Sequence, residues 1–251
     1  MPSKFPRRRP WLAGAAVVLV LACLLPPAGT YARRYIFVES FQFALFAAAL
    51  PPLLVLGAPW RALGASRLIR GPGRDAAGGS AFLRGAGALL AFMGAVIAWR
   101  LPVLVNALAT QPGLAVVEMV TLTGAGTALW LQLVESPPLL PRLPRPLRAV
   151  FAALAMWTIW VLAYMLGFAQ SAWFTAYSHP GLGTVADQEI ATGIMWGVSA
   201  ACFIPVVYVL AMTWLRDTED PDEGLRAIVR EHDQQSAPGR WPRPPRGWRS
   251  A

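Results

Sequence analysis

Apolar residues in this chain gather into six stretches separated by short polar segments. The stretches cover roughly residues 11–25, 36–58, 82–98, 114–134, 150–169 and 190–215. A helix needs about 20 consecutive apolar residues to cross the hydrocarbon layer of a membrane, and a run of this length is too long for an ordinary strand. The pattern therefore predicts an all-α polytopic membrane protein, a bundle of about six transmembrane helices embedded in a lipid bilayer.

Proline and glycine add detail to two of these stretches. Pro51 and Pro52 adjoin in the middle of the second, where each removes a backbone hydrogen bond, so this helix is expected to bend there. The sixth stretch contains Pro205, which predicts a second bend. It also contains Gly193 and Gly197, whose spacing is typical of helices that approach a neighbour closely.

Composition supports one membrane domain. The chain of 251 residues is 56% hydrophobic and 14% charged, whereas soluble proteins are about 25% charged. We expect a basic N-terminus over residues 1–10, a transmembrane domain over 11–215 and a tail over 216–251. After residue 235, proline, arginine and tryptophan alternate without a core-forming pattern, so most of the tail is expected to be disordered.

Positive charge predicts the orientation. Of the 22 lysines and arginines, only Arg33, Arg34 and Arg100 fall between the first and second stretches or between the third and fourth. The others flank the opposite ends of the stretches. Because basic residues accumulate on the cytoplasmic side, both termini are expected in the cytoplasm of a bacterium, with the chain spanning its inner (plasma) membrane. The net charge of +9 is then a topology signal, and no nucleic-acid partner is expected.

The first stretch has a second interpretation. A basic start, a short apolar segment and the small residues of Ala28–Ala32 also fit a cleaved signal peptide. Cleavage would leave five spans, whereas an uncleaved chain has six and fits the loop charges equally well.

Acidic and amide side chains lie toward one membrane face. Placed in the predicted topology, the polar residues near the extracytoplasmic ends of the spans are Glu39, Gln42, Glu118, Asp187 and Gln188. A carboxylate within a span is costly and usually faces a partner or a watery cavity, so these residues form a candidate intramembrane site. The alternative is that they lie at helix ends in headgroup water, where a helix N-terminus favours acidic residues such as Asp187.

Cysteine and histidine are too scarce for several other kinds of site. Two cysteines, Cys23 and Cys202, do not make a disulfide framework or a metal motif. The two histidines, His179 and His232, fall in a loop and in the tail, which argues against a haem held by two histidines within the bundle. No nucleophile–base pair or metal-hydrolase spacing is present, so we do not expect an enzyme.

Three segments resemble the CtaG family of haem–copper oxidase assembly proteins. Residues 39–59, which include Pro-Pro-Leu-Leu-Val-Leu-Gly-Ala-Pro, resemble its signature helix, and residues 186–196, with Asp-Gln and Ile-Met-Trp, resemble its last-helix signature. Between them, Leu101-Pro102 and the segment from Pro112 to Glu118 match in order and spacing. The resemblance covers roughly residues 35–215. It implies a membrane assembly factor for a terminal cytochrome c oxidase, with the catalytic subunit as partner.

The resemblance also suggests copper as the only cofactor or cargo. The family is proposed to help copper reach the oxidase, and it commonly carries histidines where this chain has Glu39, Phe43 and Met119, with another near Val117. Thioethers are good Cu(I) ligands. The candidate metal ligands in this chain are therefore Glu39, Met119, Met195 and His179.

The main alternative function is a small-molecule or ion transporter that uses the carboxylates of the outer leaflet. A path across the membrane needs polar groups at several depths. The cytoplasmic half of the predicted spans is almost entirely apolar, which disfavours transport.

Overall fold

The structure is a computed structural model that describes residues 10–62, 78–136, 139–177 and 183–218. Within these ranges the chain is helical and contains no strand; a single bridge joins Ser136 and Leu139. The elements are α1 (Pro10–Leu24), α2 (Ala28–Ala32), α3 (Ile36–Ala44), η1 (Leu45–Ala49), α4 (Leu50–Gly57), α5 (Pro59–Ala62), α6 (Gly78–Trp99), α7 (Pro102–Thr110), α8 (Pro112–Leu133), α9 (Arg145–Gly167), η3 (Thr175–Tyr177) and α10 (Thr184–Thr218).

Five helical segments are long and apolar enough to cross a membrane. They are Ile36–Gly57, Ser80–Trp99, Pro112–Leu133, Arg145–Gly167 and Thr184–Arg216, and a shorter apolar helix covers Trp11–Leu24. These are the six predicted stretches, which confirms the all-α polytopic fold. The last one begins six residues earlier than predicted, because Thr184 to Glu189 form the first turns of α10.

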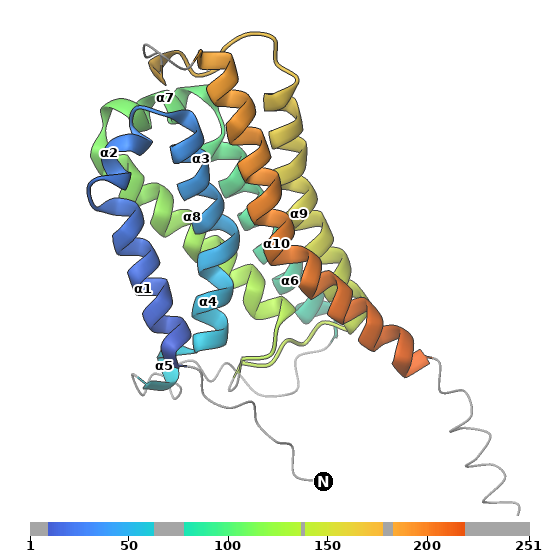
Figure 1. Cartoon of the computed structure of the whole chain (residues 1–251). Coiled ribbons are helices and arrows are strands. Elements are labelled where there is room, and N and C mark those ends of the chain that lie inside the picture. Colours follow the sequence, from blue (N-terminus) through green and yellow to red (C-terminus); the bar gives the residue numbers. More distant parts are fainter. Residues whose placement is uncertain (1–9, 63–77, 137–138, 178–182, 219–251) are drawn as a thin grey trace, which may run out of the picture. The chain divides into compact units, whose positions relative to one another are not determined.

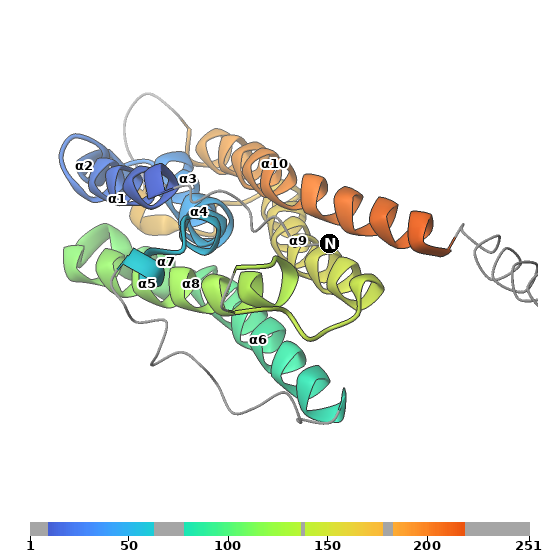
Figure 2. The ribbon, with the colours of Figure 1, turned by 90° about the horizontal axis from the view of Figure 1, so that it is seen from below.

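The chain divides into two units, residues 1–211 and 212–251. In the second unit the structure describes only the last residues of α10, and the predicted tail beyond residue 218 lies outside the described residues. Within the first unit, α4 packs between α1 and α8, α6 packs against α8 and α9, and α9 also contacts α8. Figure 1 shows the start of α3 beside α2 and α7, and Figure 2 shows α8 lying beside α4.

One end of the first unit gathers several helix termini. Helices α3, α8 and α10 begin there, α6 and α9 end there, and the short elements α2, α7 and η3 lie there (Figure 1). We call it the α7 end. The sequence predicted plain loops at this end, because α7 and η3 are too short to show an apolar period.

In the second span, where the sequence predicts a bend, a π-helical segment, η1, ends two residues before Pro51. The amide of Leu50 donates to the carbonyl of Leu45, five residues back. With the same five-residue spacing, the carbonyl of Phe46 would accept a hydrogen bond from the amide of residue 51. Residue 51 is a proline, which has no N–H. The carbonyl of Phe46 instead accepts a hydrogen bond from the Thr123 hydroxyl of α8, with 3.4 Å between the oxygens. A neighbouring helix thus satisfies the backbone group that proline leaves unpaired.

Helix α8 crosses this irregular segment at Gly126. A Cβ atom at Gly126 would lie 2.5 Å from Cγ of Pro51 and 3.0 Å from the carbonyl oxygen of Ala47. Only glycine therefore permits this approach. Away from the α7 end the contact continues into an apolar core whose largest fully buried side chains include Trp130, Phe92 and Phe203.

Candidate functional site

A buried arginine lies between two helices at the α7 end and pairs with a glutamate. Arg100 follows the last residue of α6, and its Nη2 forms an ion pair with Oε1 of Glu39 on α3. Arg100 and Glu39 are 6% and 3% exposed. A buried ion pair needs close geometry and additional hydrogen bonds to offset the loss of water. The Ser40 hydroxyl provides one, because it accepts a hydrogen bond from Nη1 of Arg100 at 2.9 Å.

Helix α3 presents two successive turns to the guanidinium. Glu39 and Phe43 are four residues apart and so share a helix face. The central carbon of the Arg100 guanidinium lies 3.9 Å from the centroid of the Phe43 ring, which is a cation–π contact. The hydroxyl of Ser40 also donates to Oε2 of Glu39 at 3.3 Å. Arg100 is therefore held by a carboxylate, a hydroxyl and an aromatic face, all from α3.

A second carboxyl group completes the site from α8. Oε1 of Glu118 lies 3.8 Å from Nη2 of Arg100, and Glu118 is 2% exposed. The side chain also interacts with Glu39. We call Glu39, Arg100 and Glu118 the ionic cluster. Its hydrogen bonding is incomplete, because Oε1 of Glu118 and Nε of Arg100 have no hydrogen-bond partner among the described residues.

Tyr177 of η3 lies within electrostatic range of the ionic cluster. Burial raises the pKa of its phenol well above the ordinary value; Glu39, Glu118 and Asp187 add to the rise and Arg100 opposes it. The hydroxyl donates to the carbonyl of Val105 on α7 at 3.3 Å. A second apolar cluster forms around this tyrosine from Ile36, Val105, Leu166, Phe174, Tyr177 and Ala191. Residues from five elements thus pack together at the α7 end.

Asp187 caps a helix to which it does not belong. This side chain from the first turn of α10 is fully buried, and its two oxygens accept hydrogen bonds from the amides of Ile36 and Phe37 at 2.9 and 2.8 Å. These amides open α3, where Tyr35 provides no side-chain cap. The sequence placed Asp187 either in the candidate site or at the N-terminus of its own helix. The structure shows it stabilising the N-terminus of the neighbouring helix that carries Glu39.

The two predicted glutamines bind helix ends rather than the ionic cluster. Nε2 of Gln42 donates to the carbonyl of Cys23 at 2.6 Å. The helical donor for that carbonyl would be residue 27, which is a proline. Nε2 of Gln188 donates to the carbonyl of Leu166 at 2.8 Å, and its Oε1 accepts from the amide of Trp173 at 3.0 Å. Both glutamines are buried; Gln42 satisfies a carbonyl that lacks its helical donor, and Gln188 ties the end of α9 to the segment that follows it.

The structure describes three of the four candidate copper ligands. Glu39 is paired with Arg100, and Met195 is fully buried in the main apolar core. Met119 is half-buried and packs against the same core, next to Glu118 in sequence. His179 lies outside the described residues. Among the described residues, no group of three or more histidine, cysteine, aspartate or glutamate side chains is placed to hold a metal ion.

Sequence reasoning used Arg100 only as a marker of topology and missed its role. The signal was present: Arg100 directly follows a long apolar run, precedes a Leu-Pro pair and stands in a segment poor in other basic residues. A basic residue at the end of a span can pair with carboxylates that are buried near the same face of the membrane.

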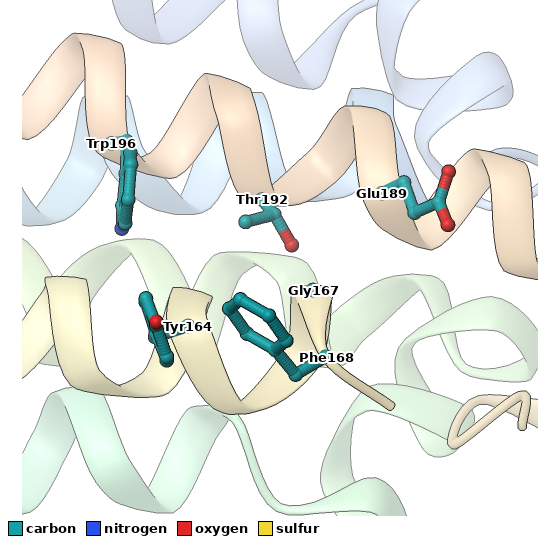
Figure 3. Close-up of a pocket in the computed structure, with 6 residues that line it drawn as sticks. All are labelled: Tyr164, Gly167, Phe168, Glu189, Thr192 and Trp196. Carbon is teal, nitrogen blue, oxygen red and sulfur yellow. The ribbon is translucent and has the colours of Figure 1, made fainter. Parts of the chain in front are cut away.

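A separate groove lies between α9 and α10. It has a volume of about 230 Å³ and is lined by Tyr164, Gly167, Phe168, Glu189, Thr192 and Trp196. Figure 3 shows the aromatic rings of Trp196 and Tyr164 at one end and the Glu189 carboxylate toward the other. The predicted close approach at Gly193 and Gly197 is not made within the described chain, because a Cβ atom at either position would meet nothing within 4 Å.

The chain matches a protein-family model. The model described as cytochrome c oxidase caa3 assembly factor matches residues 2–217, which include the ionic cluster and all but the last residue of the described helices. No curated protein matches the chain, and no solved structure does.

Proposed function

We propose that this chain assembles the catalytic subunit of a terminal haem–copper cytochrome c oxidase. The premise is that the chain belongs to the caa3 cytochrome c oxidase assembly factor family. The observation that supports a specific site is the burial of Glu39, Arg100 and Glu118 together at one end of the bundle. Buried charges in a membrane are costly and usually serve a function.

The distribution of basic residues supports an extracytoplasmic location for this site in a bacterial plasma membrane. The segments that connect spans at the α7 end contain few arginines, whereas the opposite segments are rich in arginine. The catalytic subunit would then meet the assembly factor through its extracytoplasmic half. No reaction chemistry is required for this role, which is consistent with the expected absence of enzyme activity.

A copper step stays a prediction for this chain. Of the four candidate ligands, Glu39 is engaged by Arg100, so the thioethers of Met119 and Met195 are the ligands to test. Thioethers suit Cu(I), and Met119 lies next to the ionic cluster in sequence.

The test is removal of the gene followed by complementation. Without this chain we expect loss of assembled cytochrome c oxidase, measured as haem absorbance and cytochrome c oxidation in isolated membranes. The wild-type gene should restore both, while Glu39→Gln should restore only a fraction although the variant is still present in the membrane. Unchanged oxidase after deletion would contradict the proposed function.

The transporter alternative has its own test. Ion flux in proteoliposomes that Glu118→Gln abolishes would favour transport over assembly. We expect no such flux, because the described residues bury no charged side chain near the end of the bundle opposite the α7 end.

A further inference from the structure

The ionic cluster contains its own cation at the place where a bound cation would have to lie. Nη2 of Arg100 pairs with Glu39 and is also 3.8 Å from Oε1 of Glu118. The two carboxyl groups come from α3 and α8, and they converge on the same guanidinium nitrogen. Any metal ion shared by these carboxyl groups would therefore lie within a few ångström of a permanent positive charge, where like charges repel strongly in a low-dielectric interior.

The donor atoms around the guanidinium are also unsuited to copper delivery. They are carboxylate and hydroxyl oxygens, from Glu39, Glu118 and Ser40. Such hard oxygen ligands suit magnesium, calcium or manganese, whereas Cu(I) prefers thiolate and thioether sulfur. Phe43 covers one face of the guanidinium and offers no donor atom to a metal.

Arginine suits this position better than lysine does. A planar guanidinium directs separate N–H groups at two partners while its face rests on an aromatic ring, and it stays protonated when buried. Arg100 uses these properties at once, with Nη1 on Ser40, Nη2 on Glu39 and its face on Phe43.

We propose that the Arg100 guanidinium is the resident cation of this intramembrane site, so that the site joining α3 to α8 is complete without a metal ion. The site is then a metal-free contact between α3, α8 and the end of α6. Its role in oxidase assembly rests on the proposed function. The test of the proposal uses purified protein and is independent of oxidase assembly in cells.

The first measurement is Cu(I) retention by the full chain, purified in detergent under reducing conditions and challenged with bathocuproine disulfonate. We expect that the chain and its Glu118→Gln variant retain the same amount of Cu(I). Any Cu(I) that the variant still retains is bound elsewhere in the chain, and the ionic cluster is then metal-free. One equivalent of Cu(I) that Glu39→Gln or Glu118→Gln removes would overturn the proposal.

The second measurement is chemical rescue. Arg100→Ala should lower the Tm, and millimolar guanidinium chloride should raise the Tm of this variant by about 2–4 °C relative to the same concentration of sodium chloride. Arg84→Ala is the matched control, since Arg84 is an exposed arginine of α6 that donates to the carbonyl of Ser80. A rise of equal size in both variants, or none in Arg100→Ala, would contradict the proposal. Where Arg100→Ala does not fold, the copper measurement decides.

Discussion

The two ends of the helical unit bury different kinds of side chain. At the α7 end the buried side chains include Glu39, Arg100, Glu118 and Asp187. Near the opposite end, where α4 and α8 finish, the buried polar side chain among the described residues is Ser136, whose hydroxyl donates to the carbonyl of Val55 at 2.6 Å. A single hydroxyl on a helix-end carbonyl is a packing feature. Paired buried charges are much more costly, which directs the search for function to the α7 end.

Within the α7 end itself the polar side chains divide into two groups. Asp187, Gln42 and Gln188 all bond backbone groups at helix ends, and their role is to hold the elements in place. Glu39, Arg100 and Glu118 bond mainly to one another and leave two buried polar atoms without hydrogen bonds. The first group completes the fold, and the second is the candidate functional site.

The largest effect is expected from removing the cation. Arg100→Ala leaves Glu39 and Glu118 facing each other without the guanidinium, and breaking a buried pair in this way costs about 3–5 kcal/mol. The measurement is the free energy of unfolding in mixed micelles, with Arg84→Ala as the control. A loss below about 1 kcal/mol would show that the ionic cluster is solvated like a surface salt bridge.

A smaller effect is expected from a glycine-to-alanine substitution on α8, with the same substitution two residues away as its control. Gly126→Ala places a methyl group 2.5 Å from Cγ of Pro51, so we expect a loss of about 1–3 kcal/mol from overpacking. Gly124→Ala, on the same helix, meets nothing within 4 Å and should be neutral or slightly stabilising, since alanine has the higher helix propensity. Equal losses in the two variants would contradict the close crossing of α8 and the irregular second span.

The cap of α3 should contribute less. Asp187→Ala removes both side-chain hydrogen bonds to the first amides of α3, and we expect a loss of about 1–2 kcal/mol in unfolding free energy. Glu189→Ala is the control, because Glu189 lies two residues away on α10 and is exposed. Amide exchange at Ile36 and Phe37 provides a local measurement. Unchanged protection there in Asp187→Ala would show that the cap does not hold this helix end.

The smallest effect concerns the carbonyl that Pro51 leaves unpaired. Thr123→Val removes the hydroxyl that donates to Phe46, and hydrogen bonds between membrane helices average about 0.6 kcal/mol. Thr158→Val is the control, since the Thr158 hydroxyl bonds only the carbonyl of Leu154 in its own helix. A difference between the two variants larger than about 2 kcal/mol would mean that the π-helical segment depends on this single bond.

The six helices could be predicted from the sequence, because the length of an apolar run follows directly from residue order. The sequence did not allow the pairing within the α7 end to be predicted. Pairing depends on the rotation of each helix about its axis and on Arg100, which lies just outside a span. Glu39 and Glu118 both lie close to Arg100, whereas Gln42 and Gln188 bond carbonyl groups at helix ends.

The irregular helix shows a similar limit. Two adjacent prolines predicted a bend, and the structure has a π-helical segment there whose freed carbonyl bonds to a neighbouring helix. Thr123 and Gly126 of α8 provide that neighbour, and nothing near Pro51 in the sequence points to them.

The most direct test compares two glutamates of the α7 end, one buried in the ionic cluster and one exposed in the groove. In cells that lack the chromosomal copy of the gene, Glu118→Gln and Glu189→Gln are expressed at matched levels, and cytochrome c oxidase activity is divided by the amount of each variant in the membrane. We expect a marked loss of activity for Glu118→Gln and wild-type activity for Glu189→Gln. Wild-type activity in Glu118→Gln, with the loss in Glu189→Gln instead, would contradict this expectation and move the functional site to the groove.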